Sequence, residues 1–264
     1  MRGDEVWCQL FSEPDAGSDL AAVRTRAKHV DGGWLVSGQK VWTSGAIGSD
    51  YGILLARTGG PGHAGLSVFV VPMNTPGIDI RPLLQMDGES KFNEVYLTDV
   101  RLASDAVVGE VGSGWKVATA TLGRERLSLG ANSVGMFRSL GDLVDAAEER
   151  GRLHGSLCDD ICDLWVRTWV LKTTWERAID EGAEPGDASF SVLKLLTSET
   201  LKAIGDLGIE ALGPDSLQSE AEQPIMRRLL VGHAQTILGG TSEIQRNILA
   251  ERVLGLPRAK YQDR

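Results

Sequence analysis

Three short segments of the sequence combine hydroxyl groups, glycines and an aromatic ring in patterns that suit ligand binding. Residues 12–19 form a polar, glycine-containing segment between two stretches of predicted strand. A loop held by a rigid sheet presents hydroxyls and backbone N–H groups to the edge of a flat heteroaromatic ring or to a polar ligand tail. The same residues also suit an ordinary turn, in which Asp and Ser side chains bond to their own backbone.

The other two segments lie at the end of a predicted strand and at the start of a predicted helix. At residues 42–45, Trp42 could stack on a ring while the following hydroxyls donate to its heteroatoms, although a tryptophan at a strand end commonly belongs to the core. At residues 239–242, the glycines allow close backbone approach and the helix start favours negative charge, which suits a phosphate or a dinucleotide. The alternative there is a simple helix with Thr241 as its N-cap.

Three further patterns favour structural interpretations. Residues 60–65 fit G-x-G-x-x-G, but a strand-like segment follows in place of the helix that would face a pyrophosphate, so we predict a hairpin loop. Cys158 and Cys162 are four residues apart, but zinc would need further Cys or His ligands, so we expect a buried or half-buried pair of thiols and no metal site. Trp165 and Trp169 share a helical spacing that indicates core or interface packing.

The composition excludes several classes of protein. Of the 264 residues, 42% are hydrophobic, and the seven tryptophans need packing partners, so disorder is not expected. The 27 Lys+Arg and 36 Asp+Glu residues give a net charge of -9, which argues against nucleic acid as the main ligand. No apolar stretch approaches the roughly 20 residues of a membrane helix, and Asp4 and Glu5 stand where a signal peptide needs an apolar core. We therefore expect a cytoplasmic chain without membrane insertion.

The elements that must position these segments change type near residue 110. Short Val-, Ile- and Thr-rich runs with Gly, Asp and Pro punctuation come first, and long segments of helical periodicity follow. We predict an α+β fold, with an antiparallel β-barrel or sandwich domain over residues 1–110 and an antiparallel four-helix-bundle domain over residues 111–264. The predicted strands are residues 22–30, 34–42, 51–56, 66–71, 78–82 and 94–97, and the predicted helices are residues 115–150, 158–181, 189–212, 223–237 and 242–254.

Five motifs, in this order along the chain, resemble the acyl-CoA dehydrogenases, which are flavoproteins with a β-barrel middle domain and a C-terminal helical bundle. The motifs are residues 12–19, 42–44, 92–101, 109–115 and 239–246. The resemblance implies FAD as cofactor, an acyl-CoA as substrate and electron-transfer flavoprotein as electron acceptor. It also implies a homo- or hetero-oligomer, a dimer or tetramer, with FAD shared across an interface. Family members usually begin with a further helical domain, which we expect to be missing here.

The resemblance implies roles for individual residues. Ser12 would contact the pyrimidine side of the flavin, Trp42 would pack on its isoalloxazine, and Ser44 would lie near the nitrogen that receives hydride. Ser18 would contact the pantetheine of the thioester ligand. The other implied FAD-binding residues are Thr43, Arg150, Glu210, Gly213, Thr241 and Glu243, with Arg150, Glu210 and Gly213 reaching the FAD of a neighbouring subunit, and the other implied substrate-binding residues are Arg126 and Gly240.

The implied reaction removes a proton from the carbon beside a thioester carbonyl and passes hydride from the next carbon to the flavin. That carbon is a poor acid, so the step needs a desolvated carboxylate and hydrogen bonds to the carbonyl. Many family members carry the base as a glutamate where this chain has Gly239. A few branches, isovaleryl-CoA dehydrogenase among them, place it directly before an arginine of the first bundle helix, which makes Glu125 the predicted base. The alternatives are Glu243 as base, or Glu125 as part of a solvated charge cluster.

The sequence thus predicts an FAD-dependent acyl-CoA dehydrogenase that desaturates a short, branched or ring-bearing acyl-CoA. Two other functions fit the same motifs. The chain could be a non-catalytic FAD-binding partner subunit of a hetero-oligomeric acyl-CoA dehydrogenase. It could also be an acyl-CoA oxidase, in which oxygen reoxidises the flavin.

Overall fold

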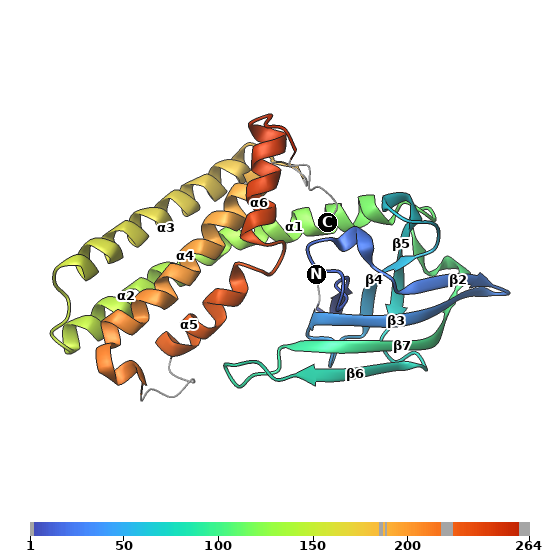
Figure 1. The fold of residues 1–264 in the computed structure, drawn as a ribbon, viewed down its shortest axis with the longest axis horizontal. Helices are drawn as coiled ribbons and strands as arrows, with labels where there is room; N and C mark the ends of the chain where they lie inside the picture. Colours follow the sequence, from blue (N-terminus) through green and yellow to red (C-terminus); the bar gives the residue numbers. More distant parts are fainter. Residues whose placement is uncertain (1–2, 185–186, 188, 218–223, 259–264) are drawn as a thin grey trace, which may run out of the picture. The chain divides into compact units, whose positions relative to one another are not determined.

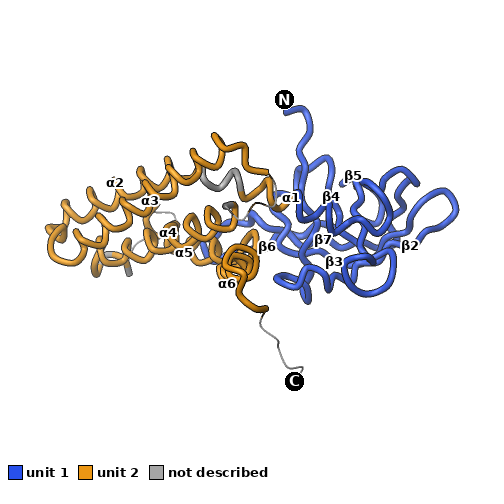
Figure 2. Tube along the Cα trace, turned by 90° about the horizontal axis from the view of Figure 1, so that it is seen from above, with its two compact units in different colours: residues 1–120 blue, residues 121–264 orange. Residues whose placement is uncertain are grey.

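A computed structural model describes residues 3–184, 187, 189–217 and 224–258 of the chain. The chain divides into two compact units between Ala120 and Thr121 (Figures 1 and 2). The dividing point lies within helix α1 (Gly114–Leu129), so this helix contributes residues to both units.

Unit 1 contains, among its described residues, an eight-stranded sheet. The strands are β1 (Trp7–Leu10), β2 (Arg26–Val30), β3 (Gly33–Ser44), β4 (Tyr51–Arg57), β5 (Leu66–Pro72), β6 (Ile78–Leu83), β7 (Phe92–Ala103) and β8 (Val107–Val108). Their order is β6-β7-β3-β2-β4-β5-β8, with β1 paired to β4 outside this path. Figure 1 shows β6, β7 and β3 side by side. Most neighbours are antiparallel, but β1 runs parallel to β4, and β2 meets β4 in parallel at Arg26 and Arg57.

The sheet curls around one apolar core. Trp34 on β3 and Phe69 on β5 are separated by β2 and β4 in the sheet, which would place them about 14 Å apart if it were flat. Their ring centroids are instead 5.2 Å apart in an edge-to-face contact. The two strands therefore face each other across the core, where Val36, Val71 and Val95 are also buried.

Unit 2 is helical. After the end of α1, its helices are α2 (Ser133–Glu149), α3 (Ser156–Asp180), α4 (Ser189–Leu212), α5 (Pro224–Gln235) and α6 (Ser242–Ile248). Met136, Leu140, Leu143 and Ala147 recur at helical spacing along α2 and are all buried, which gives this helix one apolar face. That face packs with α3 and α4 around a single core (Figure 1).

The structure confirms the predicted α+β fold but changes several elements. The single helix predicted for residues 115–150 is wrong, because a 3-10 turn (Gly130–Asn132) separates α1 from α2 and both Gly and Asn are weak helix formers. The strand predicted from residue 22 begins at Arg26, since Leu20–Ala22 forms another 3-10 turn. Strand β1 lies in the strand-like run expected before residue 12, for which no bounds were predicted, and residue 223 lies outside the described residues. The domain limits 1–110 and 111–264 stay a prediction.

Among the described residues, none of the helices combines the length and apolarity needed to cross a membrane.

The core contact between Phe69 and Trp34 gives a test of the curled sheet. We expect Phe69→Ala to lower the free energy of unfolding by about 3–5 kcal/mol, because it leaves a cavity where the facing strands meet. Urea unfolding followed by tryptophan fluorescence measures the loss. Leu84→Ala is the control, because Leu84 is 78% exposed and its truncation should change stability by no more than about 0.5 kcal/mol. Equal effects of the two changes would contradict the curled sheet.

Candidate active site

The loop after β1 lies against strand β3. The backbone groups of Glu13 and Ala16 bond to each other at 3.0 and 3.1 Å, which closes a tight turn. The Ser12 carbonyl accepts a hydrogen bond of 3.0 Å from the backbone N–H of Val41, the residue before Trp42. Ser12 is half-buried and Ser18 is exposed. Two of the predicted contact residues, Ser12 and Trp42, are thus linked through adjoining backbone.

Strand β3 is irregular where the predicted flavin contacts begin. Its register with β7 shifts between Lys40 and Thr43, and Trp42 has a φ of 60°, which is unusual for a residue with a side chain. The Trp42 side chain is 57% exposed and its ring meets Phe92 edge-on at 6.2 Å. The Thr43 side chain is buried, and its Oγ1 has no hydrogen-bond partner among the described residues.

An open cavity of about 540 Å³ lies at this end of the sheet, within unit 1. Ser44 lines it together with residues of β6 and β7. The lining residues are Ser44, Gly45, Ile47, Pro82, Ser90, Lys91, Phe92 and Asn93.

In unit 2, the turn before α6 is held by three side chains, those of Thr241, Gln245 and Lys194. Gly239 and Gly240 have φ values of 64° and 94°, and Thr241 caps α6 by accepting a hydrogen bond from the N–H of Ile244 at 3.2 Å. The Gln245 amide donates to the carbonyls of Gly239 and Gly240 at 3.4 and 3.3 Å. The buried Lys194 donates to the Gln235 carbonyl at the end of α5, at 3.1 Å. The turn is therefore fixed from both sides.

Glu125 lies beside this turn. A Cβ built on Gly239 would be 3.9 Å from Glu125 Oε1, and one built on Gly240 would be 3.7 Å from an Arg126 nitrogen. Although the Glu125 residue as a whole is exposed, crowding around its carboxyl desolvates it and raises its pKa, and the Arg126 charge opposes this. Burial likewise lowers the pKa of Arg126, with Glu125 opposing the shift. The Arg126 Nε is buried and has no hydrogen-bond partner among the described residues.

Glu243 differs from Glu125 in its surroundings. It is exposed in the first turn of α6, and hydrogen bonds from its own backbone N–H and from Thr241 lower its pKa. A carboxylate with a lowered pKa is the weaker base of the two.

The structure does not bring Arg150, Glu210 and Gly213 to the turn. Lys194 and Glu210 are sixteen residues apart on α4, which corresponds to about 24 Å along a helix. At that far end, Arg152 Nε donates to the Glu210 carbonyl at 2.8 Å and its guanidinium packs against Gly213. Arg150 donates to the Ala146 carbonyl at 3.0 Å. These three predicted FAD contacts form a separate group within unit 2.

The glycine-rich and tryptophan patterns have the structural character predicted for them, and the cysteine pair differs. Residues 60–65 belong to the connection between β4 and β5. Cys158 is half-buried, but Cys162, one helical turn further along the same side of α3, is exposed. No group of metal-binding side chains occurs in the part of the chain that the structure describes. Trp165 and Trp169 both pack against Phe137, at 5.1 and 5.3 Å.

Four side chains that support the site were not predicted from the sequence. They are Glu13, Lys40, Lys194 and Gln245, and all four are buried. For Lys194 a signal existed, because it is a lone cation among the apolar residues 192–196. For the other three, the sequence offers no such signal.

Comparison with known proteins shows which family has this order of a β unit and a helical unit. Residues 8–100 match the family model for the acyl-CoA dehydrogenase middle domain, and residues 112–254, more than half of the chain, match that for the C-terminal domain. The chain is 42% identical to acyl-CoA dehydrogenase IpdE1 of Mycobacterium tuberculosis, over 96% of this chain and 68% of that protein. The chain belongs to the acyl-CoA dehydrogenase family. Members of this family are FAD-dependent oxidoreductases.

Two solved structures illustrate the likeness of this acyl-CoA dehydrogenase family member. The steroid acyl-CoA dehydrogenase Tcur3481-Tcur3483 has a TM-score of 0.87 and 29% identity, over 97% of this chain and 70% of that one. The FAD complex of PigA has a TM-score of 0.84 and 26% identity, over 96% of this chain and 68% of that one.

The strand ends of unit 1 suit a flavin. The exposed Trp42 indole offers a flat face, the buried Thr43 Oγ1 has unused hydrogen-bonding capacity, and Ser44 borders an open cavity. These are the groups that an aromatic ring with polar edges requires.

The Thr241 cap gives a test of the turn. We expect Thr241→Ala to lower the free energy of unfolding by about 1 kcal/mol, because the Ile244 N–H loses its acceptor. Thr241→Ser keeps the hydroxyl oxygen and should retain most of the stability. Thermal unfolding of both variants measures the difference, and equal melting temperatures would show that the cap contributes nothing.

Proposed function

We propose that this chain is an FAD-dependent acyl-CoA dehydrogenase in which Glu125 takes the proton from the carbon beside the thioester carbonyl. One observation carries the proposal. The Glu125 carboxyl lies 3.9 Å from the place where a side chain at position 239 would begin, so it occupies the neighbourhood of the glutamate that many relatives carry there. Its raised pKa strengthens it as a base, while the competing Glu243 has a lowered pKa.

Each unit contributes its own part of the chemistry. In unit 2, Glu125 accepts the proton, and Arg126 and Gly240 bind the thioester, where hydrogen bonds to its carbonyl stabilise the developing negative charge. In unit 1, Ser12, Trp42, Thr43 and Ser44 hold the isoalloxazine, and Ser18 contacts the pantetheine. FAD, when bound, supplies the acceptor for hydride from the neighbouring carbon. Thr241 and Glu243 contact FAD, and Arg150, Glu210 and Gly213 contact that of a neighbouring subunit.

The substrate we propose is a branched or ring-bearing acyl-CoA rather than a long straight chain. The likeness to a steroid acyl-CoA dehydrogenase supports a ring-bearing acyl group, and Gly239 adds no side-chain bulk beside Glu125. We further propose electron-transfer flavoprotein as electron acceptor, a dimer or tetramer as the assembly, and the cytoplasm as the compartment.

Replacement of the proposed base is the direct test. In the FAD-loaded chain, anaerobic addition of short, branched and ring-bearing acyl-CoA thioesters should bleach the flavin absorbance with at least one of them. Glu125→Gln should slow the bleaching at least about 100-fold, because the amide cannot accept the proton. Glu148→Gln, at an exposed carboxyl of α2 with no proposed role, is the matched control and should retain the rate, while Glu243→Gln tests the competing base. Bleaching that persists in Glu125→Gln and is lost in Glu243→Gln would move the base to Glu243.

The pH dependence of the same step reports the raised pKa of Glu125. Only the ionised carboxylate accepts a proton, so the bleaching rate should fall as pH decreases through a pKa above the ordinary glutamate value of about 4.3. Stopped-flow bleaching across the acidic range measures this fall in rate. The residual rate of Glu125→Gln should not show the fall. A fall that persists in this variant would assign the titration to another group.

A further inference from the structure

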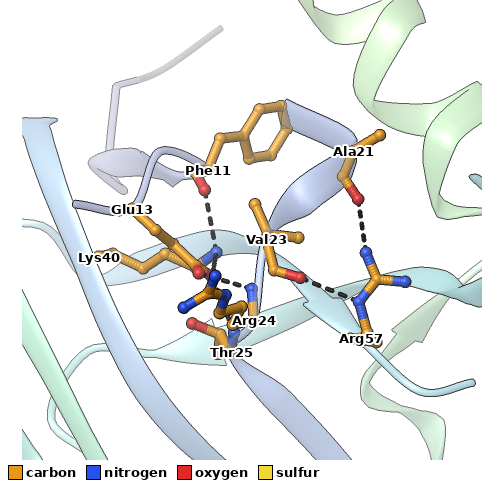
Figure 3. Close-up of polar contacts among 8 residues, drawn as sticks. All are labelled: Phe11, Glu13, Ala21, Val23, Arg24, Thr25, Lys40 and Arg57. Atoms are coloured by element: carbon orange, nitrogen blue, oxygen red, sulfur yellow. Dashed lines mark hydrogen bonds and ion pairs between the residues drawn. The ribbon is translucent and has the colours of Figure 1, made fainter. Parts of the chain in front are cut away.

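A buried ion pair lies directly behind the loop of residues 11–25, which includes the predicted ligand-binding segment of residues 12–19. Lys40 is fully buried on β3, and its Nζ donates to Glu13 Oε1 at 2.7 Å and to the Phe11 carbonyl at 2.9 Å (Figure 3). Glu13 is only 7% exposed, and its carboxylate also accepts hydrogen bonds from the backbone N–H groups of Arg24 and Thr25, at 2.6 and 2.9 Å. One carboxylate thus joins strand β3 to both ends of the loop.

These contacts bracket Ser12. Its preceding residue, Phe11, and its following residue, Glu13, are both bonded to Lys40, while its own carbonyl accepts the Val41 N–H. The next residue on β3 is Trp42, where the strand takes its irregular conformation. The ion pair therefore holds Ser12 at a set distance from the strand segment that carries Trp42, Thr43 and Ser44.

A second cation fixes the far side of the same loop. Arg57 on β4 donates to the carbonyls of Val23 and Ala21, at 2.9 and 2.5 Å (Figure 3). It also donates to the Gly60 carbonyl at 2.6 Å, so the residues that follow Ser18 are tied to the β4–β5 connection. The loop is anchored at each end by a charged side chain.

Burial makes the Lys40–Glu13 pair an expensive way to stabilise a fold. Desolvation lowers the pKa of Lys40 to about 8, against the attraction of Glu13. Burial also disfavours the Glu13 carboxylate, but the Lys40 charge and the hydrogen bonds it accepts outweigh this and lower its pKa. Buried ion pairs are commonly no more stabilising than apolar side chains of similar volume. The main effect of the Lys40–Glu13 pair is therefore on the conformation of the loop and not on the stability of the sheet.

We propose that Glu13 and Lys40 are positioning residues, which hold Ser12 and the loop of residues 11–25 in the conformation that the flavin requires. This inference rests on the proposed function, in which Ser12 and Trp42 contact the flavin. Neither Glu13 nor Lys40 needs to touch the cofactor, because both act through the backbone on either side of Ser12.

The test compares charge-removing variants with two matched controls. Lys40→Met and Glu13→Gln break the pair, and the double variant Glu13→Gln/Lys40→Met removes both charges, so that no buried charge is left unpaired. Val36→Ala on the same strand destabilises the core without touching the pair. Asp15→Asn breaks the ion pair of Asp15 with Arg24, which lies in the same loop but is 72% and 79% exposed and should contribute little.

Three measurements are made on each chain. Hydrogen exchange without FAD should be at least about tenfold faster over residues 11–25 in the pair variants, because the bonds that hold this loop are lost. Their FAD dissociation constant, from flavin fluorescence, should rise at least about tenfold, including in the double variant. At saturating FAD, their visible flavin spectrum should differ from that of the unaltered chain. Val36→Ala and Asp15→Asn should keep loop exchange, FAD affinity and spectrum.

Three outcomes would overturn the proposal. Unchanged exchange over residues 11–25 in the double variant would show that the pair does not order the loop, whatever happens to FAD. Faster exchange with unchanged FAD affinity would show that the loop conformation does not matter to the flavin. An equal loss of FAD affinity in Val36→Ala would show that Glu13 and Lys40 affect FAD binding only through the stability of the fold. Failure of the unaltered chain to bind FAD is distinguishable from all three and would contradict the proposed function together with this inference.

Discussion

A side chain at position 239 would begin beside the carboxylate of Glu125. With 3.9 Å between Glu125 Oε1 and a Cβ at position 239, a glutamate there would bring a second carboxylate, and so a like charge, close to the first. The left-handed backbone at Gly239 and Gly240 keeps this space clear, and Gln245 and Lys194 fix the turn that creates it. A proposed base on α1 and a glycine at position 239 of the turn therefore go together.

The two units support their proposed contact residues in the same way. In unit 1 the buried Lys40 donates to the carbonyl of Phe11, and in unit 2 the buried Lys194 donates to that of Gln235. Each bond fixes the backbone beside a segment with proposed contact residues. Burial lowers the pKa of both lysines to about 8, with Arg126 adding to the effect at Lys194, which shows how much hydration each has lost. The two buried lysines therefore fix the backbone beside these segments and have no proposed part in the reaction.

Local patterns were enough to predict most strands and helices in their order, because periodicity and turn residues act over short distances. The roles of Glu125 and Gly239 followed from the family resemblance and stay a prediction. Local patterns could not reveal that Trp34 and Phe69 meet, or that β1 adds to β4 in parallel, since both depend on the curl of the whole sheet. The break at residues 130–132 was missed because apolar spacing continues across it. Glu13 and Lys40 are 27 positions apart, and nothing in their neighbours announces that they pair.

Trp42 shows a conflict between folding and ligand contact. A residue with a side chain pays about 1–2 kcal/mol for a left-handed φ such as its 60°, and glycine avoids most of this penalty. More than half of the indole is also exposed, so the ring adds little to the core. Selection for heat resistance alone would therefore favour glycine at this position and erase the aromatic surface, so a thermostabilised form should be screened for flavin retention as well as for melting temperature.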